Sequence, residues 1–162
     1  MSERFVKSAD TRVPVGRSRD ELERVLRRYG ATAFASASDY EAGTVSVSFK
    51  VPNAPGESST VPVRLEAGFL LIYARLFGEP RGHKYDADRL AQAERVAWRH
   101  LVLWVDAACT AVGAGLQTMR EAFFAHTVVR NAATGRIERM AEAVAQIASE
   151  GRLMLPSGDG DG

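Results

Sequence analysis

The sequence predicts an α+β fold: an N-terminal helix, a small antiparallel three-stranded sheet, then a long core helix and two shorter C-terminal helices. Three observations support it. Residues 18–30 carry clear helix start and stop signals, residues 44–51 alternate strictly between apolar and polar, and residues 86–113 form a long, mostly apolar helical segment. Strands grouped together and followed by helices are typical of helices packed on one face of an antiparallel sheet.

The composition fits one globular domain. The chain has 162 residues, of which 46% are hydrophobic and 25% charged, and its formal net charge is +1. This length can bury a hydrophobic core without disulfides. We expect a flexible arm over 1–16, a single α+β domain over 17–156 and a disordered tail over 157–162. A near-zero net charge gives no overall attraction to nucleic acid, so any basic surface must be local.

The first predicted helix begins at Ser18. Ser18 and Glu21 have the spacing of a capping box, in which each side chain satisfies a backbone N–H of the other residue. An apolar stripe at helical spacing follows, and Gly30 is the expected left-handed stop. The stripe consists of Leu22, Val25, Leu26 and Tyr29.

Three strands are predicted over Thr32–Ser38, Thr44–Val51 and Thr60–Leu65. In the second, apolar and polar residues alternate, so one face is buried and the other solvated. Pro62 cannot donate a ladder hydrogen bond, which places the third strand at an edge of the sheet. The inward residues of the second and third strands are Val45, Val47, Phe49, Val51, Val61, Val63 and Leu65.

The middle of the chain leads into the long helix. Glu66–Phe77 fits either a short helix or a continued strand, and Asp86 is a plausible N-cap. The helix from Asp86 to Gly113 is apolar almost all round, which indicates a core helix or an oligomer seam. The chain's single cysteine, Cys109, has small apolar neighbours and is expected to be a buried packing residue.

Two shorter helices are predicted near the C-terminus. Thr118 and Glu121 repeat the capping-box spacing and start a helix that runs through His126. A short extended piece and a turn follow over Thr127–Gly135. Arg136–Glu150 then fits an amphipathic helix. Its expected inward residues are Ile137, Met140, Ala141, Val144 and Ile147.

No catalytic motif stands out. The chain has no nucleophile elbow, P-loop or dinucleotide-binding fingerprint. The three histidines are scattered and lack metal-ligand spacing, so we assign no catalytic residue, no metal site and no cofactor. A small enzyme of unknown class, with a pocket near His83 and Tyr85, remains an alternative.

The one group of side chains that indicates binding is basic and consists mostly of arginines. Arg24, Arg27 and Arg28 share the surface of the first helix, and Lys50 and Arg64 lie on the outward phase of the strands. If the helix and the sheet adjoin, these five residues form a basic surface that can contact phosphates. An ordinary solvated face is the other interpretation. Tyr40 and Tyr85 are the few aromatic residues placed to stack on bases.

Most of the chain, from Val13 to Pro156, resembles a family of small uncharacterised proteins from bacteriophages and bacterial mobile elements. The matching segments are Val13–Ala31 with Ser18 and Glu21, Trp98–Arg99, Ala111–Gly115, Thr118 with Glu121, Phe123–His126 and Gly151–Pro156. The chain departs from the family at Glu66–Gly82, an apparent insertion, and at Arg136–Met140. The family has no known function, so the resemblance implies a phage or prophage context and no site residue.

The leading hypothesis is a non-enzymatic phage accessory protein that binds nucleic acid, as single-stranded DNA or a recombination intermediate. The alternative is a protein-interaction module, such as a counter-defence factor that captures a host protein. Its contacts would come from Trp98, Val102, Trp104 and Val105, or from Phe69–Phe77, and part of the apolar belt is expected to meet a second copy in a homodimer. Residues 1–7 have no apolar core and no segment is long enough to span a membrane, so we expect a cytoplasmic protein.

Overall fold

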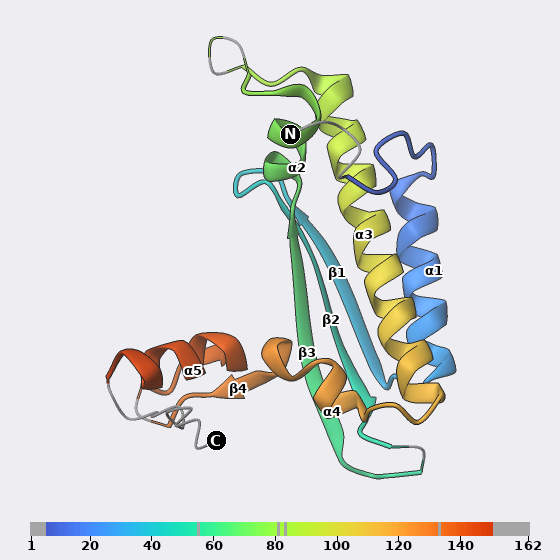
Figure 1. Cartoon of the computed structure of the whole chain (residues 1–162), viewed down its shortest axis with the longest axis vertical. Coiled ribbons are helices and arrows are strands. Elements are labelled where there is room, and N and C mark those ends of the chain that lie inside the picture. Colours follow the sequence, from blue (N-terminus) through green and yellow to red (C-terminus); the bar gives the residue numbers. More distant parts are fainter. Residues whose placement is uncertain (1–5, 55, 81, 83, 133, 151–162) are drawn as a thin grey trace, which may run out of the picture.

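The computed structural model describes residues 6–54, 56–80, 82, 84–132 and 134–150. It is an α+β fold with a helical layer on a three-stranded antiparallel sheet (Figure 1). The elements are α1 (Val15–Arg28), β1 (Ala33–Asp39), β2 (Thr44–Pro52), β3 (Thr60–Gly68), α2 (Phe69–Phe77), α3 (Ala87–Gly113), α4 (Met119–Ala122), η3 (Phe124–His126), β4 (Val128–Arg130), β5 (Ile137–Arg139) and α5 (Met140–Ser149).

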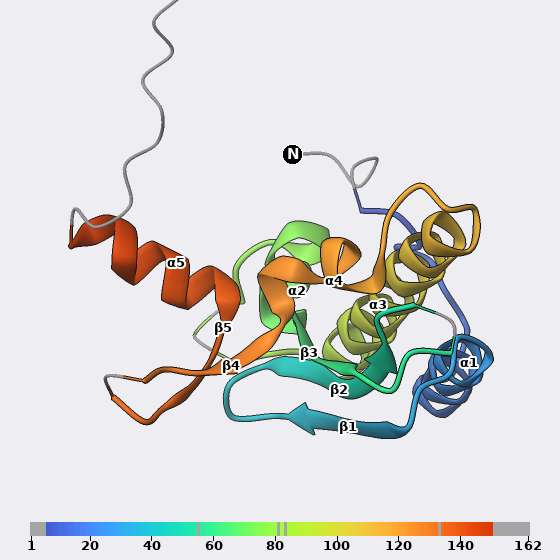
Figure 2. The ribbon, with the colours of Figure 1, turned by 90° about the horizontal axis from the view of Figure 1, so that it is seen from below.

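The sheet has the order β1-β2-β3, with both pairs antiparallel. Its inner face is apolar because Phe49 of β2 lies opposite Phe34 on one side and Val63 on the other. All the inward residues predicted for β2 and β3 are buried, which confirms the alternation. Helices α2, α3, α4 and α5 all lie on one side of the sheet (Figure 2). The opposite, outer face carries none of the described helices.

The predicted strand edge and helix stops are confirmed. β3, which contains Pro62, is an edge strand, and Gly30 has a φ of 87° directly after α1. Asp86 caps α3 by accepting a hydrogen bond from the backbone N–H of Arg89. The ambiguous segment before it resolves into a continued β3, to Gly68, followed by α2.

Helix α3 is the core helix. It packs against α1, α2 and the inner sheet face, and Cys109 is buried within it, as predicted. Burial, and second the nearby Asp106, raise the pKa of the Cys109 thiol to about 12. Trp98, Val102 and Val105 are fully or almost fully buried in the same chain. The prediction that these three residues form an interaction or oligomer surface is therefore wrong, since one chain covers them.

Helix α1 does not start at Ser18. It begins at Val15, after Pro14, whose extended backbone is the N-cap. Proline has no N–H and a fixed φ, so it suits a helix start. Ser18 therefore lies inside the first turns, buried, and its hydroxyl has no hydrogen-bond partner among the described residues. The predicted Ser18–Glu21 capping box is wrong, whereas the Thr118–Glu121 capping box is present in α4.

The end of the chain differs from the prediction. Residues predicted as one helix from Arg136 form a strand, β5, which pairs with β4, and α5 begins only at Met140. Ile137 was expected to point inward but is 67% exposed. In Figures 1 and 2 the hairpin and α5 project away from the body beside β3. We call β4, β5 and α5 the arm.

Part of the N-terminal segment 1–16, which we expected to be flexible, contacts α3. The side-chain amide of Gln92 donates to the backbone oxygens of Ala9 and Thr11, at 2.8 and 3.0 Å. The ring of His100 forms a 2.6 Å hydrogen bond with the backbone oxygen of Lys7. The predicted disordered tail, 157–162, lies outside the described residues.

Two hydroxyl deletions should have opposite effects on stability. Ser18→Ala removes a buried hydroxyl without a partner among the described residues and places a better helix former in α1, so we expect a gain of about 0.5 kcal/mol in the free energy of unfolding. Thr118→Ala removes a cap and should cost about 1 kcal/mol. Urea denaturation of both variants measures the difference. A loss of stability in Ser18→Ala would contradict the helix start at Val15.

Candidate functional site

The outer face of the sheet carries two of the predicted basic residues. Lys50 lies opposite Ala33 on β1 and Pro62 on β3, and Arg64 lies opposite Ser48. Because directly opposed residues share a face, Lys50 and Arg64 are diagonal neighbours across β2 and β3. Both are exposed. The other residues of the outer phase are mostly small or hydroxylated, and they also include Pro62 and two carboxylates, Asp39 and Glu66. The small and hydroxylated ones are Ala33, Ala35, Ala37, Thr44, Ser46, Ser48 and Thr60.

The three arginines of α1 lie near the same end of the sheet. Arg24, Arg27 and Arg28 lie in the last two turns of α1, and all three are exposed. Arg27 lines a surface hollow together with Ala33, which is the strand neighbour of Lys50. Helix and sheet therefore adjoin at this end, the condition under which the sequence predicted one basic surface.

Some of these cations have acidic partners. Arg27 forms a 2.7 Å salt bridge with Glu23, and Arg64 lies 3.7 Å from Glu66. Exposed pairs of this kind contribute little to stability and separate at low cost. Within the described part of the chain, Arg24, Arg28 and Lys50 have no salt-bridge partner. These three side chains are therefore available to an external anion.

The hairpin of the arm extends the outer face. Val63 of β3 forms an antiparallel bridge with Thr127, so Thr127 shares the inner face with Val63 and the next residue, Val128, is on the outer face. By the same alternation, Arg130 is on that face too. The residues directly opposite on β5 share it, because Val128 pairs with Arg139 and Arg130 pairs with Ile137. Exposed Arg130 thus prolongs the surface beyond β3, whereas the guanidinium of Arg139 is paired with Glu142 of α5 at 2.7 Å.

A further arginine lies at the lower end of the molecule in Figure 1, where α4 meets the end of β2. The backbone N–H of Arg120 donates to Asn53 Oδ1 at 3.2 Å, and the Arg120 side chain is exposed. Arg28 and Asn53 line one cavity of about 350 Å³ at this end. The sequence could not place Arg120 here, because the contact joins segments 67 residues apart.

The outer face offers phosphate contacts, and its described residues include no aromatic ring for stacking. Phe34 and Phe49 lie on the inner phase of their strands. Tyr40 is 71% exposed, but its ring lies 6.2 Å from that of Phe69 and its hydroxyl 3.5 Å from Glu94 on the helical side. The expectation that Tyr40 is placed to stack on bases is therefore not supported by its position.

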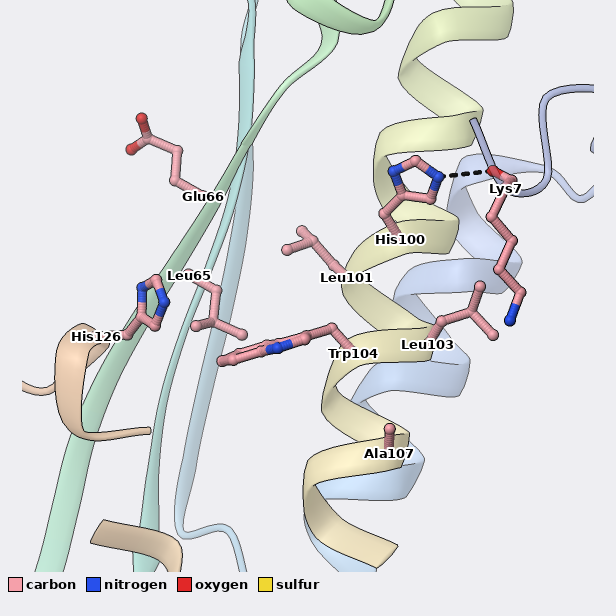
Figure 3. A pocket seen from close by; sticks show the side chains of 9 residues that line it. All are labelled: Lys7, Leu65, Glu66, His100, Leu101, Leu103, Trp104, Ala107 and His126. Atoms are coloured by element: carbon pink, nitrogen blue, oxygen red, sulfur yellow. Dashed lines mark hydrogen bonds between the residues drawn. The ribbon is translucent and has the colours of Figure 1, made fainter. Parts of the chain in front are cut away.

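A second candidate feature is an open, apolar cavity of about 540 Å³ between α3 and β3 (Figure 3). Trp104, which is 40% exposed, projects from α3 toward His126 of η3, and the two rings are 5.3 Å apart. Leu101 and Leu65 face each other at its base. We call this cavity the groove. Of the four predicted interaction residues, only Trp104 reaches such a surface.

His126 is the polar residue of the groove with the most altered environment. Its Nδ1 is buried and has no hydrogen-bond partner among the described residues. Burial, and second the positive charge of Arg139, lower the pKa of His126 below its ordinary value of 6.5. The imidazole is therefore neutral near pH 7.

The described residues give no sign of a metal centre. They contain no group of three or more His, Cys, Asp or Glu side chains that could hold an ion. His83, half of the pocket suggested for an enzyme, lies outside the described residues. Tyr85 packs edge-on against Tyr73 at 5.1 Å. Within the same described ranges, no helix has the length and apolarity that a membrane span requires.

No family model, no curated protein and no solved structure matches this chain. The resemblance to small phage proteins therefore stays a prediction. Function has to be inferred from the fold and from the two surfaces described above.

Stability should depend on pH through His126. The unfolded chain protonates His126 near pH 6.5, whereas the folded chain resists protonation, so stability falls as pH drops below about 6.5. We expect the urea midpoint to fall between about pH 7.5 and about pH 5.5. His126→Gln should show a smaller fall over the same range. An equal fall in both proteins would contradict the buried, neutral imidazole.

Proposed function

We propose that this protein is a non-enzymatic accessory protein of a phage or mobile element that binds nucleic acid on the outer face of its sheet. The observation that carries the proposal is the alignment of Lys50 and Arg64 on an uncovered face, with Arg27 beside it at one end and Arg130 beyond its β3 edge. Single-stranded DNA or a recombination intermediate is the expected ligand.

The chemistry favours contacts with phosphates. Lysine, arginine, serine and threonine are side chains that contact the nucleic-acid backbone, and such contacts carry no sequence information. Ser48, directly opposite Arg64, supplies a hydroxyl beside the two cations, and Thr60 supplies another further along β3. Since the described residues of this face include no aromatic ring, base stacking cannot provide the affinity, and binding should be independent of sequence and sensitive to salt.

The low net charge is compatible with this proposal because the cations are unevenly distributed. Arg24, Arg27 and Arg28 occupy two turns of one helix, and Glu23 is the acidic residue paired within this cluster. A local concentration of positive charge attracts a polyanion even when the whole chain is close to neutral.

A gel-shift titration tests the proposal. We expect labelled single-stranded and duplex oligonucleotides to shift at low salt with micromolar or tighter affinity, and the affinity to fall steeply as salt rises. The double variant Lys50→Ala/Arg64→Ala should reduce the slope of log affinity against log salt. On a single strand, the reduction should be about 0.7 for each phosphate that the variant no longer neutralises.

Lys84→Ala is the matched control. Lys84 is an exposed lysine that lines a different cavity, beside Tyr73 and Asp86, so its removal should leave affinity and slope unchanged. Arg130→Ala tests whether the hairpin takes part and should weaken binding. The absence of any shift at micromolar protein, or an equal effect of Lys84→Ala and Lys50→Ala/Arg64→Ala, would overturn the proposal.

A further inference from the structure

The cavity that Arg28 and Asn53 line adjoins the end of the outer face. Pro52 also lines it, and Pro52 lies on the outer phase of β2, two residues beyond Lys50. Arg28 is the last residue of α1, in the same basic cluster as Arg27. A nucleic-acid strand that follows the cations of the outer face would therefore reach this cavity. We call it the end cavity.

The end cavity has apolar walls and one aromatic ring. Met119, which is 2% exposed, and Val112 contribute apolar side chains, and Tyr29 contributes its ring. Gly113 leaves room beside this ring, because a Cβ at that position would meet the Tyr29 hydroxyl at 3.1 Å. The described residues of the outer face include no aromatic ring. The end cavity therefore supplies the kind of stacking partner that the face lacks.

The polar side chains of the end cavity are available to a ligand. Among the described residues, none pairs with the Tyr29 hydroxyl, the Arg28 guanidinium or the side-chain N–H groups of Asn53. The backbone N–H of Arg120 donates to Asn53 Oδ1 at 3.2 Å and so leaves the N–H groups of that amide free. The described lining includes no carboxylate. Because the free groups are mainly donors, they favour a ligand that is rich in acceptor atoms.

We propose that the end cavity takes up one unpaired base of the nucleic acid that binds the outer face. A base has flat faces that stack on aromatic rings and an edge that forms hydrogen bonds, and unpaired bases are recognised through both. The volume of about 350 Å³ lies at the lower end of the roughly 300–1,000 Å³ that small-ligand sites occupy, which suits a single base.

This role rests on the proposed function and adds strand selectivity to it. The cations of the outer face contact phosphates, which single strands and duplexes share. A base inside a duplex is paired and stacked, so it can enter the end cavity only after it is extruded, at a cost in free energy. An unpaired base enters without that cost. The expected ligand is therefore a single strand, or a duplex that contains an unpaired base.

Three duplexes of one sequence test the end cavity. The first is fully paired, the second carries one extra unpaired base, and the third carries one extra abasic residue at the same place. Fluorescence anisotropy at low salt should show the second binding about tenfold more tightly than the first, because one stacked base contributes on that order. The abasic bulge also interrupts the duplex but offers no base, so it should bind like the paired duplex.

Variants of the lining should remove this tenfold gain. Ala54 is half-buried in the lining, so Ala54→Trp fills the end cavity, and the gain should vanish while the circular dichroism spectrum stays unchanged. Ala91→Trp is the matched control: Ala91 is an exposed alanine of α3, about 30 Å along the helix from Val112, and the gain should persist.

A second pair of variants keeps the charge constant. Arg28→Lys retains the positive charge but loses the planar set of donors, so it should reduce the gain. Arg24→Lys is its matched control, because Arg24 is an exposed arginine one turn earlier and does not line the end cavity. The gain should be unchanged in that variant.

The outcomes separate this proposal from the proposed function. If none of the duplexes and no single strand binds at micromolar protein, the proposed function fails and this proposal fails with it. If the three duplexes bind equally, or if the abasic bulge binds as tightly as the unpaired base, the outer face binds nucleic acid but the end cavity takes up no base. A full gain in folded Ala54→Trp would also overturn the proposal.

Discussion

Burial of helix α3 is the constraint on which the rest of the structure depends. A helix that is apolar almost all round requires partners on several sides, and α1, α2 and the inner sheet face provide them. Trp98 lies fully buried at this junction, with the Arg19 guanidinium 5.4 Å from its ring centre. Once α3 is covered in this way, none of the described helices is left for the outer face of the sheet, and the groove and the arm lie at the edge of β3.

The sequence predicted the elements whose stability is local and missed those that tertiary contacts decide. The alternation in β2 predicted its buried face because a strand between two neighbours must keep one phase inside. The same reasoning failed at Ser18, where a plausible capping box competed with Pro14 and lost, because proline starts the helix about one turn earlier. It failed again at Ile137, since a helical period cannot reveal that β4 and β5 pair as a hairpin.

The residues of the candidate surfaces divide in the same way, into those that local pattern places and those that tertiary contacts place. Lys50 and Arg64 could be assigned to the outer face from strand alternation alone, and the register confirms that they share it. Arg120 and Arg130 could not, because their positions depend on contacts between distant segments. The apolar surface that runs almost all round α3 did indicate that a three-stranded sheet alone could not cover this helix. However, α1 and α2 cover most of that surface, and Trp104 is the one predicted interaction residue left at the groove.

The outer sheet face and the groove lie on opposite sides of β3, and the hairpin of β4 and β5 adjoins both of them. Its outer phase carries Arg130, while Val129 and Glu138 of the other phase line a cavity together with Ile147 of α5. Thr127 is bridged to Val63 of β3 and accepts a hydrogen bond from the backbone N–H of Met140, so the hairpin and the start of α5 are held to β3 together. The position of Arg130 relative to Lys50 and Arg64 therefore depends on the same contacts that hold α5.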